Sequence, residues 1–195
     1  MKVLYLGPDS PLVTYLQKQG EEVIRIEEKI SPQDVVGTEA DYLVSYGYRH
    51  IISEEILALF FRKAINLHIS LLPWNRGADP NFWSWIEGTP KGVSIHYLDT
   101  GVDTGDVLGQ KEIPESDFGE NPTLASTYEL LQREIQELFK EKWELLRIGR
   151  CHRKKQEGPW SFHLKKQKEK LEHLLTEGWD TPVSVLVEYG KSRRG

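Results

Sequence analysis

Short apolar runs alternate with amphipathic segments through the first third of the chain. Three segments between the runs are predicted to be helices. Asp9–Gln19 carries an apolar stripe of Leu12, Val13 and Leu16. The other two helices are predicted to begin at Ser31-Pro32 and at Ser53, the latter before Ile56-Leu57. The apolar runs themselves are short and nearly continuous, which predicts buried strands at Lys2–Leu6, Val23–Ile26, Asp41–Tyr46 and Ala64–His68. Strands and helices that alternate in this way predict a parallel sheet covered by helices.

The following part of the chain predicts a different arrangement. A helix over Asn81–Glu87 follows an aromatic loop, and Gly92–Leu98 and Val107–Ile113 form a hairpin-like, antiparallel strand pair. The longest helix begins near Asn121-Pro122. Its apolar positions recur at helical spacing and predict one buried face, made of Leu124, Tyr128, Leu131, Ile135, Leu138 and Leu145. That face would serve a homodimer as readily as a core.

The length of 195 residues suits about one domain. The amino-acid composition changes near residue 150, where the basic segments His152–Lys155 and Lys165–Lys170 follow a largely acidic part of the chain. We therefore expect a catalytic core over residues 1–150 and a short C-terminal extension over residues 151–195 that packs on the core and is not a separate domain. The basic segments are either solvated surface or a rim that faces phosphate.

Composition narrows the possible partners. Lys and Arg number 25 against 30 Asp and Glu, a net charge of −5, which disfavours a general nucleic-acid binder. The one cysteine, Cys151, excludes an intramolecular disulfide framework and a cysteine-based metal cluster. The chain shows neither a charged-then-apolar leader nor an apolar stretch of membrane-spanning length. We expect a soluble, cytoplasmic protein with no membrane partner and no bound metal.

Reactive polar side chains concentrate first at the end of the fourth predicted strand. Strand alternation places Asn66 and His68 on one face, and the carboxyl ends of strands are where open α/β sheets bind ligands. An amide that donates a hydrogen bond to an oxyanion, beside an imidazole that moves a proton, is a workable pair for acyl transfer. A satisfied structural pair is the plainer interpretation of these two residues.

The second concentration is the glycine-punctuated loop Thr100–Asp106. Its carboxylate Asp103 could orient His68 and stabilise the protonated imidazole, while the glycines allow a tight turn and close approach of a flat ligand. A simple turn or a calcium-binding loop would carry the same residues. The chain contains no Gly-x-Gly-x-x-Gly, P-loop or His-Glu-x-x-His motif, so dinucleotide, nucleoside triphosphate and zinc-protease chemistry lack their residues.

Two continuous stretches, Asn66–Trp83 and Gly92–Asp106, resemble the formyltransferase family that uses 10-formyltetrahydrofolate. The likeness is dense, in the correct order, and extends from about residue 41 to residue 113. It implies a Rossmann-like, three-layer α/β fold with a mostly parallel sheet, an antiparallel strand pair and a short C-terminal helical extension. It also implies that Asn66, His68 and Asp103 are the catalytic trio. Ile69 stands where many members have proline, which alters loop stiffness more than chemistry.

The resemblance further implies where the folate co-substrate binds. Its pterin ring would contact the backbone after the third strand and the loop before Asp103, at Tyr48, Arg49, His50, Ile51, Ile52, Asp99, Gly101 and Val102. Backbone groups would bind the pterin edge, and Ile51 and Ile52 would cover its face, although plain core packing explains these two isoleucines equally well. An amine of the acceptor would then attack the formyl carbon.

The family divides by acceptor. Methionyl-tRNA formyltransferases carry a substantial C-terminal domain, for which the residues after Cys151 are too few. Glycinamide ribonucleotide formyltransferases place a glycine- and serine-rich phosphate loop after the first strand, where this chain has Gly7–Pro11 with two prolines that lack amide donors. Ser45–Ile52 and Arg76–Trp83 resemble the third branch, which formylates a nucleotide-linked amino sugar.

We therefore expect formyl transfer to a dTDP- or UDP-linked 4-amino-4,6-dideoxy sugar, and the short length resembles enzymes of pseudaminic-type acid pathways. The substrate-binding residues implied are Trp74, Arg76, Gly77, Pro80, Asn81 and Trp83, with tryptophans stacking on base or sugar and Arg76 meeting a phosphate. Core packing is the alternative for the tryptophans. Three other functions stay open: a glycinamide ribonucleotide formyltransferase, a non-catalytic folate-binding module, and a metal-dependent hydrolase using His68, His96 and Asp103.

Overall fold

The computed structural model describes residues 1–194, and their contacts form two compact units. Unit 1 comprises Met1–His68, Ile95–Gly109 and Gln136–Lys155. Unit 2 comprises Ile69–Ser94, Gln110–Ile135 and the residues from Gln156 onward. Residues 151–194 thus divide between both units. The assignment of residues 1–150 to a catalytic core and of 151–195 to an extension stays a prediction.

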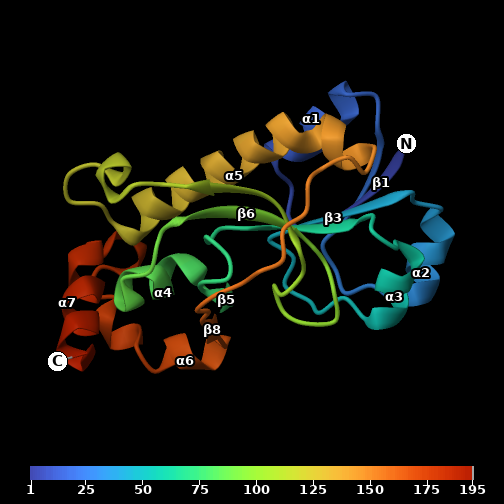
Figure 1. Cartoon of the computed structure of the whole chain (residues 1–195). Coiled ribbons are helices and arrows are strands. Elements are labelled where there is room, and N and C mark those ends of the chain that lie inside the picture. The colour runs from blue at the N-terminus through green and yellow to red at the C-terminus, as the bar shows by residue number, and fades with distance from the viewer. Residues whose placement is uncertain (195) are drawn as a thin grey trace. The chain divides into compact units, whose positions relative to one another are not determined.

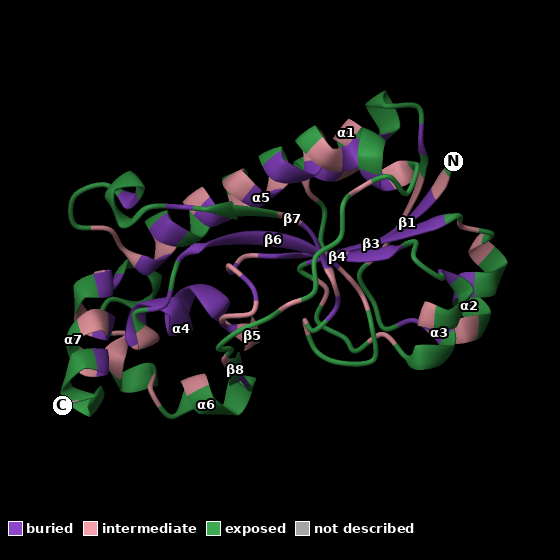
Figure 2. Ribbon diagram, in the orientation of Figure 1, coloured by how far each residue is buried: buried purple, intermediate pink, exposed green. Residues whose placement is uncertain are grey.

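The strands of unit 1 are the apolar runs of the sequence. Strands β1 (Lys2–Leu6), β2 (Glu22–Ile26), β3 (Tyr42–Tyr46) and β4 (Ala64–His68) lie in the order β2-β1-β3-β4, and all neighbours in this series are parallel. Figure 2 shows β1, β3 and β4 buried along most of their length. Burial of both faces explains why these strands are continuously apolar rather than alternating.

Each helix of this half begins at a serine that caps it. Ser10 accepts a hydrogen bond from Leu12 N at the start of α1 (Pro11–Lys18), and Ser53 accepts one from Ile56 N at the start of α3 (Glu54–Leu59). At α2 (Pro32–Thr38), Ser31 and Asp34 form a capping box. These caps satisfy amide groups that the first helical turn leaves unpaired, which is why Ser31 and Ser53 located the starts of α2 and α3 in the sequence.

Helices cover both faces of the strands in unit 1, as Figure 1 shows. One face packs Leu4, Leu6 and Leu43 against α2 and α3. On the other face, Tyr42 meets Trp143 of helix α5 (Leu124–Arg147) edge-on at 5.5 Å. The alternation of β3 side chains therefore assigns Leu43 to one helical layer and Tyr42 to the other. The predicted three-layer α/β arrangement is confirmed.

Strands β6 (Gly92–Tyr97) and β7 (Val107–Glu112) complete a six-stranded sheet in the order β2-β1-β3-β4-β6-β7. Both strands, like α5, have residues in each unit. Tyr97 N donates to Asp106 O, and Ile113 N donates to Lys91 O, which is the antiparallel pattern. The predicted antiparallel pair is confirmed.

Unit 2 is built on helix α4 (Pro80–Glu87), which is buried on nearly all sides. Helix α7 (Val183–Arg194) packs on it at Gly190, where a Cβ would overlap the Ile86 carbonyl oxygen. The short strands β5 (Arg76–Gly77) and β8 (Phe162–His163) pair in parallel. The remaining elements are α6 (Lys165–Glu169) and the 3₁₀ turns η1 (Glu115–Phe118), η2 (Glu172–Leu174) and η3 (Gly178–Asp180). The predicted C-terminal helical extension is confirmed.

The predicted stripe on α5 is wrong at two positions. Leu124, Leu131, Ile135 and Leu138 are buried as expected, but Tyr128 and Leu145 are 41% and 43% exposed. The buried face instead continues through Phe139, Trp143 and Leu146. It shifts around the helix because the first half of α5 packs within unit 2 and the second half within unit 1. One straight stripe cannot describe a helix with two sets of neighbours. The homodimer stays a prediction.

None of the helices formed by residues 1–194 is both long and apolar enough to cross a membrane.

Candidate active site

Strand β4 presents Asn66 and His68 on one face, as its alternation predicts. Asn66 stands opposite Ser45 in the register of β3 and β4, and His68 is the last residue of the strand. His68 is 7% exposed. The parallel strands therefore deliver both side chains to the carboxyl end of the sheet in unit 1, where ligands bind in open α/β sheets.

The loop after β6 holds Asp103 in a left-handed conformation, with φ of 54°. Asp99 Oδ1 accepts hydrogen bonds from Gly101 N at 3.1 Å and from Thr104 Oγ1 at 2.6 Å, which closes the turn on itself. A Cβ at Gly101 would overlap the Thr104 hydroxyl, and a Cβ at Gly105 would overlap the Tyr97 carbonyl oxygen. Both glycines are thus required by the turn that presents Asp103.

The three predicted catalytic side chains meet in unit 1. Asn66 Nδ2 donates to Asp103 Oδ1 at 3.2 Å, and His68 Nδ1 lies 3.6 Å from Asp103 Oδ2. These distances are at the long end of the hydrogen-bond range. A carboxylate next to His68 can fix the orientation of the imidazole, and the amide beside it can donate to an oxygen that gains negative charge.

A fourth residue, His96 of β6, joins this cluster. Its Nε2 lies 3.2 Å from Asn66 Nδ2 and 3.3 Å from Asp103 Oδ1. Its Nδ1 lies 2.8 Å from the carbonyl oxygen of Tyr97, which can only accept, so Nδ1 carries the hydrogen and Nε2 of the neutral ring accepts from Asn66. The sequence had suggested His96 only as a residue of a hydrolase. The pairing of Leu98 N with Ala64 O, which aligns His96 with Asn66, was the missing information.

The segment predicted to bind folate combines packed and exposed side chains. Tyr48 donates to Glu28 O at 2.9 Å, and burial raises the pKa of its phenol, which keeps the hydroxyl neutral. Ile52 packs partly against the core, whereas Arg49, His50 and Ile51 are exposed. Ile51 is 79% exposed and Val102 is 40% exposed. Exposed aliphatic groups of this kind fit a planar ring, so the residues present are compatible with the pterin.

The residues predicted to bind the acceptor lie in unit 2 in two environments. Trp74, Arg76 and Gly77 are partly exposed, whereas Pro80, Asn81 and Trp83 are buried. Asn81 Nδ2 donates to Leu124 O and to Thr127 Oγ1 at 3.1 and 3.0 Å. Trp83 stacks on His163 with ring centroids 3.9 Å apart. The structure therefore gives Asn81 and Trp83 packing contacts, and their part in substrate binding stays a prediction.

The loop that carries Arg76 is fixed by residues that no sequence pattern singled out. Arg76 Nε and Nη2 donate to Gln156 Oε1 at 3.1 and 2.7 Å. Its neighbour Asn75 is fully buried and donates through Nδ2 to Glu87 Oε2 at 2.9 Å. A Cβ at Gly77 would overlap the His163 carbonyl oxygen. No motif marks Gln156 or His163, because they belong to a C-terminal segment without periodicity.

Glu87 is the centre of these contacts. Its Oε2 also accepts from Ser161 Oγ at 2.8 Å, and its Oε1 lies 2.9 Å from His163 Nε2. Burial by itself raises the pKa of the carboxyl, but the hydrogen bonds from His163, Ser161 and Asn75 outweigh burial and lower it. Glu87 is therefore an ionised carboxylate that joins α4 to the loop of Arg76 and to β8.

The basic C-terminal segments form few ion pairs with neighbouring acids. Arg153 lies 3.7 Å from Asp106, and Lys168 lies 2.6 Å from Asp79. Lys165 and Lys166 are exposed. Within residues 1–194, no group of three or more His, Cys, Asp or Glu side chains is arranged to hold a metal ion.

Comparison with known proteins gives consistent matches. A family model described as formyl transferase matches residues 10–132, which include Asn66, His68 and Asp103. The methionyl-tRNA formyltransferase of Bacillus thuringiensis (strain Al Hakam) is 31% identical over 174 residues, which are 86% of this chain and 54% of that protein. The chain thus spans about half the length of the curated relatives it matches.

Solved structures of formyltransferases superpose on the chain. The formyltransferase PseJ from Anoxybacillus kamchatkensis, solved with UDP-4,6-dideoxy-4-formamido-L-AltNAc and tetrahydrofolate, is 44% identical with a TM-score of 0.91. That match covers 97% of this chain and 100% of PseJ. A sugar N-formyltransferase from Shewanella sp. FDAARGOS_354 shares the fold at 22% identity and a TM-score of 0.76, over 97% of this chain and 86% of its own. Because the family model spans more than half of the sequence, the chain belongs to the formyl transferase family.

Proposed function

We propose that the protein transfers a formyl group from 10-formyltetrahydrofolate to the amino group of a nucleoside-diphosphate-linked amino sugar. The observation that carries the proposal is the gathering of Asn66, His68 and Asp103 in a chain that matches PseJ over that protein's whole length. PseJ was solved with a UDP-linked 4-formamido sugar, so a UDP-linked 4-amino-4,6-dideoxy sugar is the favoured acceptor and its dTDP counterpart the second. The proposal places the protein in the cytoplasm and includes no nucleic-acid partner.

The folate supplies the formyl group when it is bound, and the residues predicted to hold it are those of the loop at Tyr48–Ile52 together with Asp99, Gly101 and Val102. Exposed Ile51 and Val102 would cover the faces of the pterin ring. Tyr48 supports this loop from within through its bond to Glu28 O, so we assign binding there to the backbone rather than to the Tyr48 hydroxyl.

The chain's polar residues perform the chemistry of amide formation. The acceptor nitrogen forms a bond to the formyl carbon, the bond from that carbon to its donor nitrogen breaks, and one proton passes from the acceptor to the donor nitrogen. Asn66 Nδ2 donates to the formyl oxygen as negative charge develops there. His68 Nδ1 faces Asp103, so we assign the proton transfer to its Nε2.

The acceptor's diphosphate requires a cation, and Arg76 is the residue of the predicted set that offers one. Gln156 holds its guanidinium through two of its nitrogen atoms, which limits its rotamers before a ligand arrives. Trp74 and Gly77 lie beside it in the sequence and are partly exposed. Pro80, Asn81 and Trp83 would contribute by supporting this loop.

Product analysis tests the proposal. The protein is incubated with 10-formyltetrahydrofolate and either a UDP-linked 4-amino sugar, its dTDP counterpart, glycinamide ribonucleotide or methionyl-tRNA, and products are identified by mass spectrometry. We expect formylated UDP-sugar, and His68→Ala should reduce its rate by on the order of 10²-fold or more with an unchanged circular dichroism spectrum. His152→Ala, at an exposed site, is the matched control.

Other outcomes would identify other functions. Formylation of glycinamide ribonucleotide or methionyl-tRNA alone would contradict the sugar acceptor but keep the enzyme class. Folate binding without formylation of any amine would favour a non-catalytic folate-binding module. A fully active His68→Ala protein would overturn the mechanism.

A further inference from the structure

His96 of β6 contacts each of the three predicted catalytic side chains. Its Nε2 lies 3.2 Å from Asn66 Nδ2 and 3.3 Å from Asp103 Oδ1, and its ring meets the His68 ring edge-on with centroids 6.4 Å apart. The side chain of His96 is 1% exposed, against 8% for His68 and 11% for Asp103. His96 is thus the least accessible member of the cluster, so we expect it to act on a ligand through its neighbours rather than by direct contact.

The backbone fixes which ring nitrogen of His96 carries a hydrogen. Its Nδ1 lies 2.8 Å from the carbonyl oxygen of Tyr97, which can only accept. That carbonyl is closely confined, since a Cβ at Gly105 would overlap it, and Tyr97 N is itself bonded to Asp106 O. The hydrogen therefore lies on Nδ1, and Nε2 of the neutral ring is an acceptor.

Three atoms of the cluster, Asn66 Nδ2, His96 Nε2 and Asp103 Oδ1, form a triangle with sides of 3.2, 3.3 and 3.2 Å. A contact of this length between two nitrogens is a hydrogen bond only where one of them lacks a hydrogen, as Nε2 of the neutral ring does. If the Asn66 amide were rotated by half a turn, its Oδ1 would face a carboxylate and an unprotonated ring nitrogen, and neither can donate. Both neighbours therefore select the orientation in which the amide nitrogen points into the cluster.

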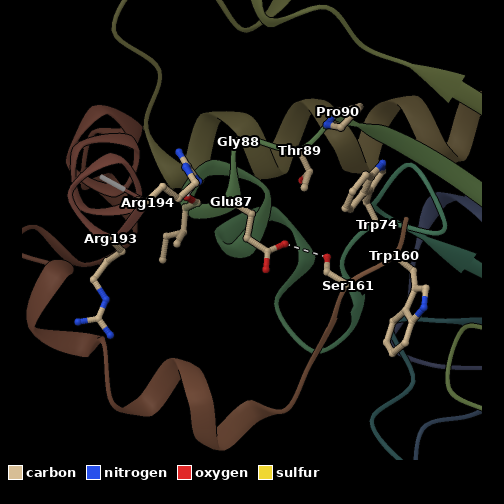
Figure 3. A pocket seen from close by; sticks show the side chains of 11 residues that line it. Trp74, Glu87, Gly88, Thr89, Pro90, Trp160, Ser161, Arg193 and Arg194 are labelled. Carbon is tan, nitrogen blue, oxygen red and sulfur yellow. Dashed lines mark hydrogen bonds between the residues drawn. The ribbon is translucent and has the colours of Figure 1, made fainter. Parts of the chain in front are cut away.

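Asn75 of unit 2 shows how a buried amide is oriented from both ends. Its Nδ2 donates to Glu87 Oε2 at 2.9 Å, and its Oδ1 accepts from Thr89 Oγ1 at 2.7 Å. Figure 3 shows the side chains of Thr89 and Glu87 and the hydrogen bond that Ser161 donates to Glu87. In contrast, no residue among 1–194 donates to Oδ1 of Asn66, so only the partners of its nitrogen orient that amide.

The two partners of the Asn66 nitrogen differ in how they are held. Asp103 lies on a loop, whereas His96 lies within β6, which Leu98 N joins to β4 by donating to Ala64 O. His96 is therefore the acceptor that the sheet itself aligns with Asn66. With both acceptors present, one still holds the amide when a ligand oxygen replaces the other. With Asp103 alone, the amide can rotate about its Cβ–Cγ bond, and its N–H no longer meets an oxyanion at a fixed position.

We propose that His96 is a positioning residue for formyl transfer. Its Nε2 accepts from Asn66 and holds the amide nitrogen where the formyl oxygen gains negative charge, while the hydrogen on its Nδ1, bonded to Tyr97 O, keeps Nε2 an acceptor. No bond is made or broken at His96, which acts through Asn66. Its part in the reaction rests on the proposed function, whereas its hydrogen bond to Asn66 does not.

Two substitutions at position 96 separate positioning from packing. His96→Gln keeps an oxygen acceptor at about the reach of Nε2, whereas His96→Leu has similar bulk and no acceptor. We expect His96→Leu to lower kcat for formyl transfer by about 10–100-fold and to change KM for the acceptor by less than about threefold. His96→Gln should restore kcat to within about fivefold of the unaltered protein. Product analysis at varied acceptor concentrations measures both constants.

Ile95→Val is the control for the stability of the strand. Ile95 is fully buried on β6 next to His96, and strand alternation places it on the opposite face. Loss of a buried methyl group should lower the free energy of unfolding, which urea titration measures, and leave kcat within about twofold. If Ile95→Val lowered kcat as far as His96→Leu does, the effect at position 96 would be one of stability, and the positioning role would be overturned.

Nitrogen NMR of the full chain tests the hydrogen bond without any activity. In protein with isotope-labelled histidine, the signals absent from His96→Gln belong to His96, and we expect a hydrogen on Nδ1 and none on Nε2. Hydrogen exchange of the Asn66 side-chain amide, assigned with Asn66→Ser, should be at least about tenfold faster in His96→Leu and little changed in His96→Gln. The ring measurement uses the unaltered protein, so it is decisive even if His96→Leu does not fold.

The outcomes separate this role from the proposed function. A hydrogen on Nε2 would overturn the role, because Nε2 could not accept from Asn66. The role is also overturned if His96→Leu is as active as the unaltered protein, or if His96→Gln is no more active than His96→Leu; formyl transfer by the unaltered protein then keeps the function. If the unaltered protein formylates no amine while the NMR results are as expected, the function fails and the placement of Asn66 by His96 stands.

Discussion

Each unit contains a carboxylate flanked by an asparagine and a histidine, yet the two groups differ in how tightly they are held. In unit 1, Asp103 lies 3.2 Å from Asn66 and 3.6 Å from His68. In unit 2, Glu87 accepts from Asn75 at 2.9 Å and meets His163 at the same distance. The same three kinds of group thus form a loose cluster around Asp103 at the end of β4 and a tight cluster around Glu87. We infer from these distances that the side chains around Asp103 can exchange hydrogen-bond partners, whereas those around Glu87 hold the Arg76 loop in place.

The largest effect is expected from the loose group. Asp103→Asn removes the carboxylate charge beside His68 and Asn66 and should lower kcat/KM for formyl transfer by about 10²–10³-fold. The midpoint of thermal unfolding should change little, since the carboxylate of Asp103 holds Asn66 and His68 only at long distances. Steady-state assays and calorimetry measure the two quantities, with Asp106→Asn as the control carboxylate. If Asp103→Asn were about as active as the unaltered protein, the cluster around Asp103 would not differ in function from the cluster around Glu87.

The compact group should show the opposite response, a large loss of stability. Glu87→Ala leaves buried Asn75 and His163 without their shared acceptor, so the free energy of unfolding should fall by about 2–3 kcal/mol. Urea titration measures this, and Glu120→Ala, at an exposed position, should change it by less than about 0.5 kcal/mol. Equal stability of the two variants would show that Glu87 does not fasten the loop.

A smaller effect is expected from the glycine that brings the Arg76 loop against β8. Gly77→Ala introduces a Cβ that overlaps the His163 carbonyl oxygen, whereas Gly178, also at positive φ, has open space around it. Both alanines incur the strain of positive φ, so their difference isolates the overlap. We expect Gly77→Ala to lose about 1–2 kcal/mol more of the free energy of unfolding than Gly178→Ala. Similar losses would contradict a tight contact between β5 and β8.

The smallest expected effect concerns pH. The folded-state pKa of Glu87 is lowered from its ordinary value of 4.5. Its contribution to stability is therefore complete well above pH 4.5 and declines as the pH falls through the folded pKa. The stability difference between the unaltered protein and Glu87→Gln should narrow on going from pH 7 to pH 4, as measured by urea titration. A difference that widens over this interval would mean that the carboxylate is not preferentially ionised in the folded state.

Local chemistry explains what the sequence predicted well. The buried strands were continuous apolar runs, and β1 and β4 have the bounds expected from them. Serines at the helix starts located α2 and α3, the apolar stripe located α1, and the alternation of β4 paired Asn66 with His68. These features depend on neighbours a few residues away, so periodicity and cap residues are sufficient to find them.

Contacts between distant segments account for what the sequence did not predict. His96 joins the cluster because β6 lies beside β4, and Glu87 becomes a centre because Asn75, Ser161 and His163 converge on it. The exposure of Leu145 has the same origin, since the buried face of α5 shifts where its neighbours change. Neither the spacing nor the composition of these residues contains that information.

The two hydrogens on Asn66 Nδ2 have a consequence for how this cluster would bind a ligand. One is directed to Asp103 and the other to His96, so the amide has no spare donor before a ligand arrives. A formyl oxygen can accept a hydrogen bond from Asn66 Nδ2 only if it replaces Asp103 or His96 as the acceptor. The free-energy cost is then the difference between two hydrogen bonds and not the loss of a whole one. Before a ligand binds, both hydrogens of the Asn66 amide are thus bonded within the protein. One of them becomes available to the ligand's oxygen only when that oxygen replaces an internal acceptor.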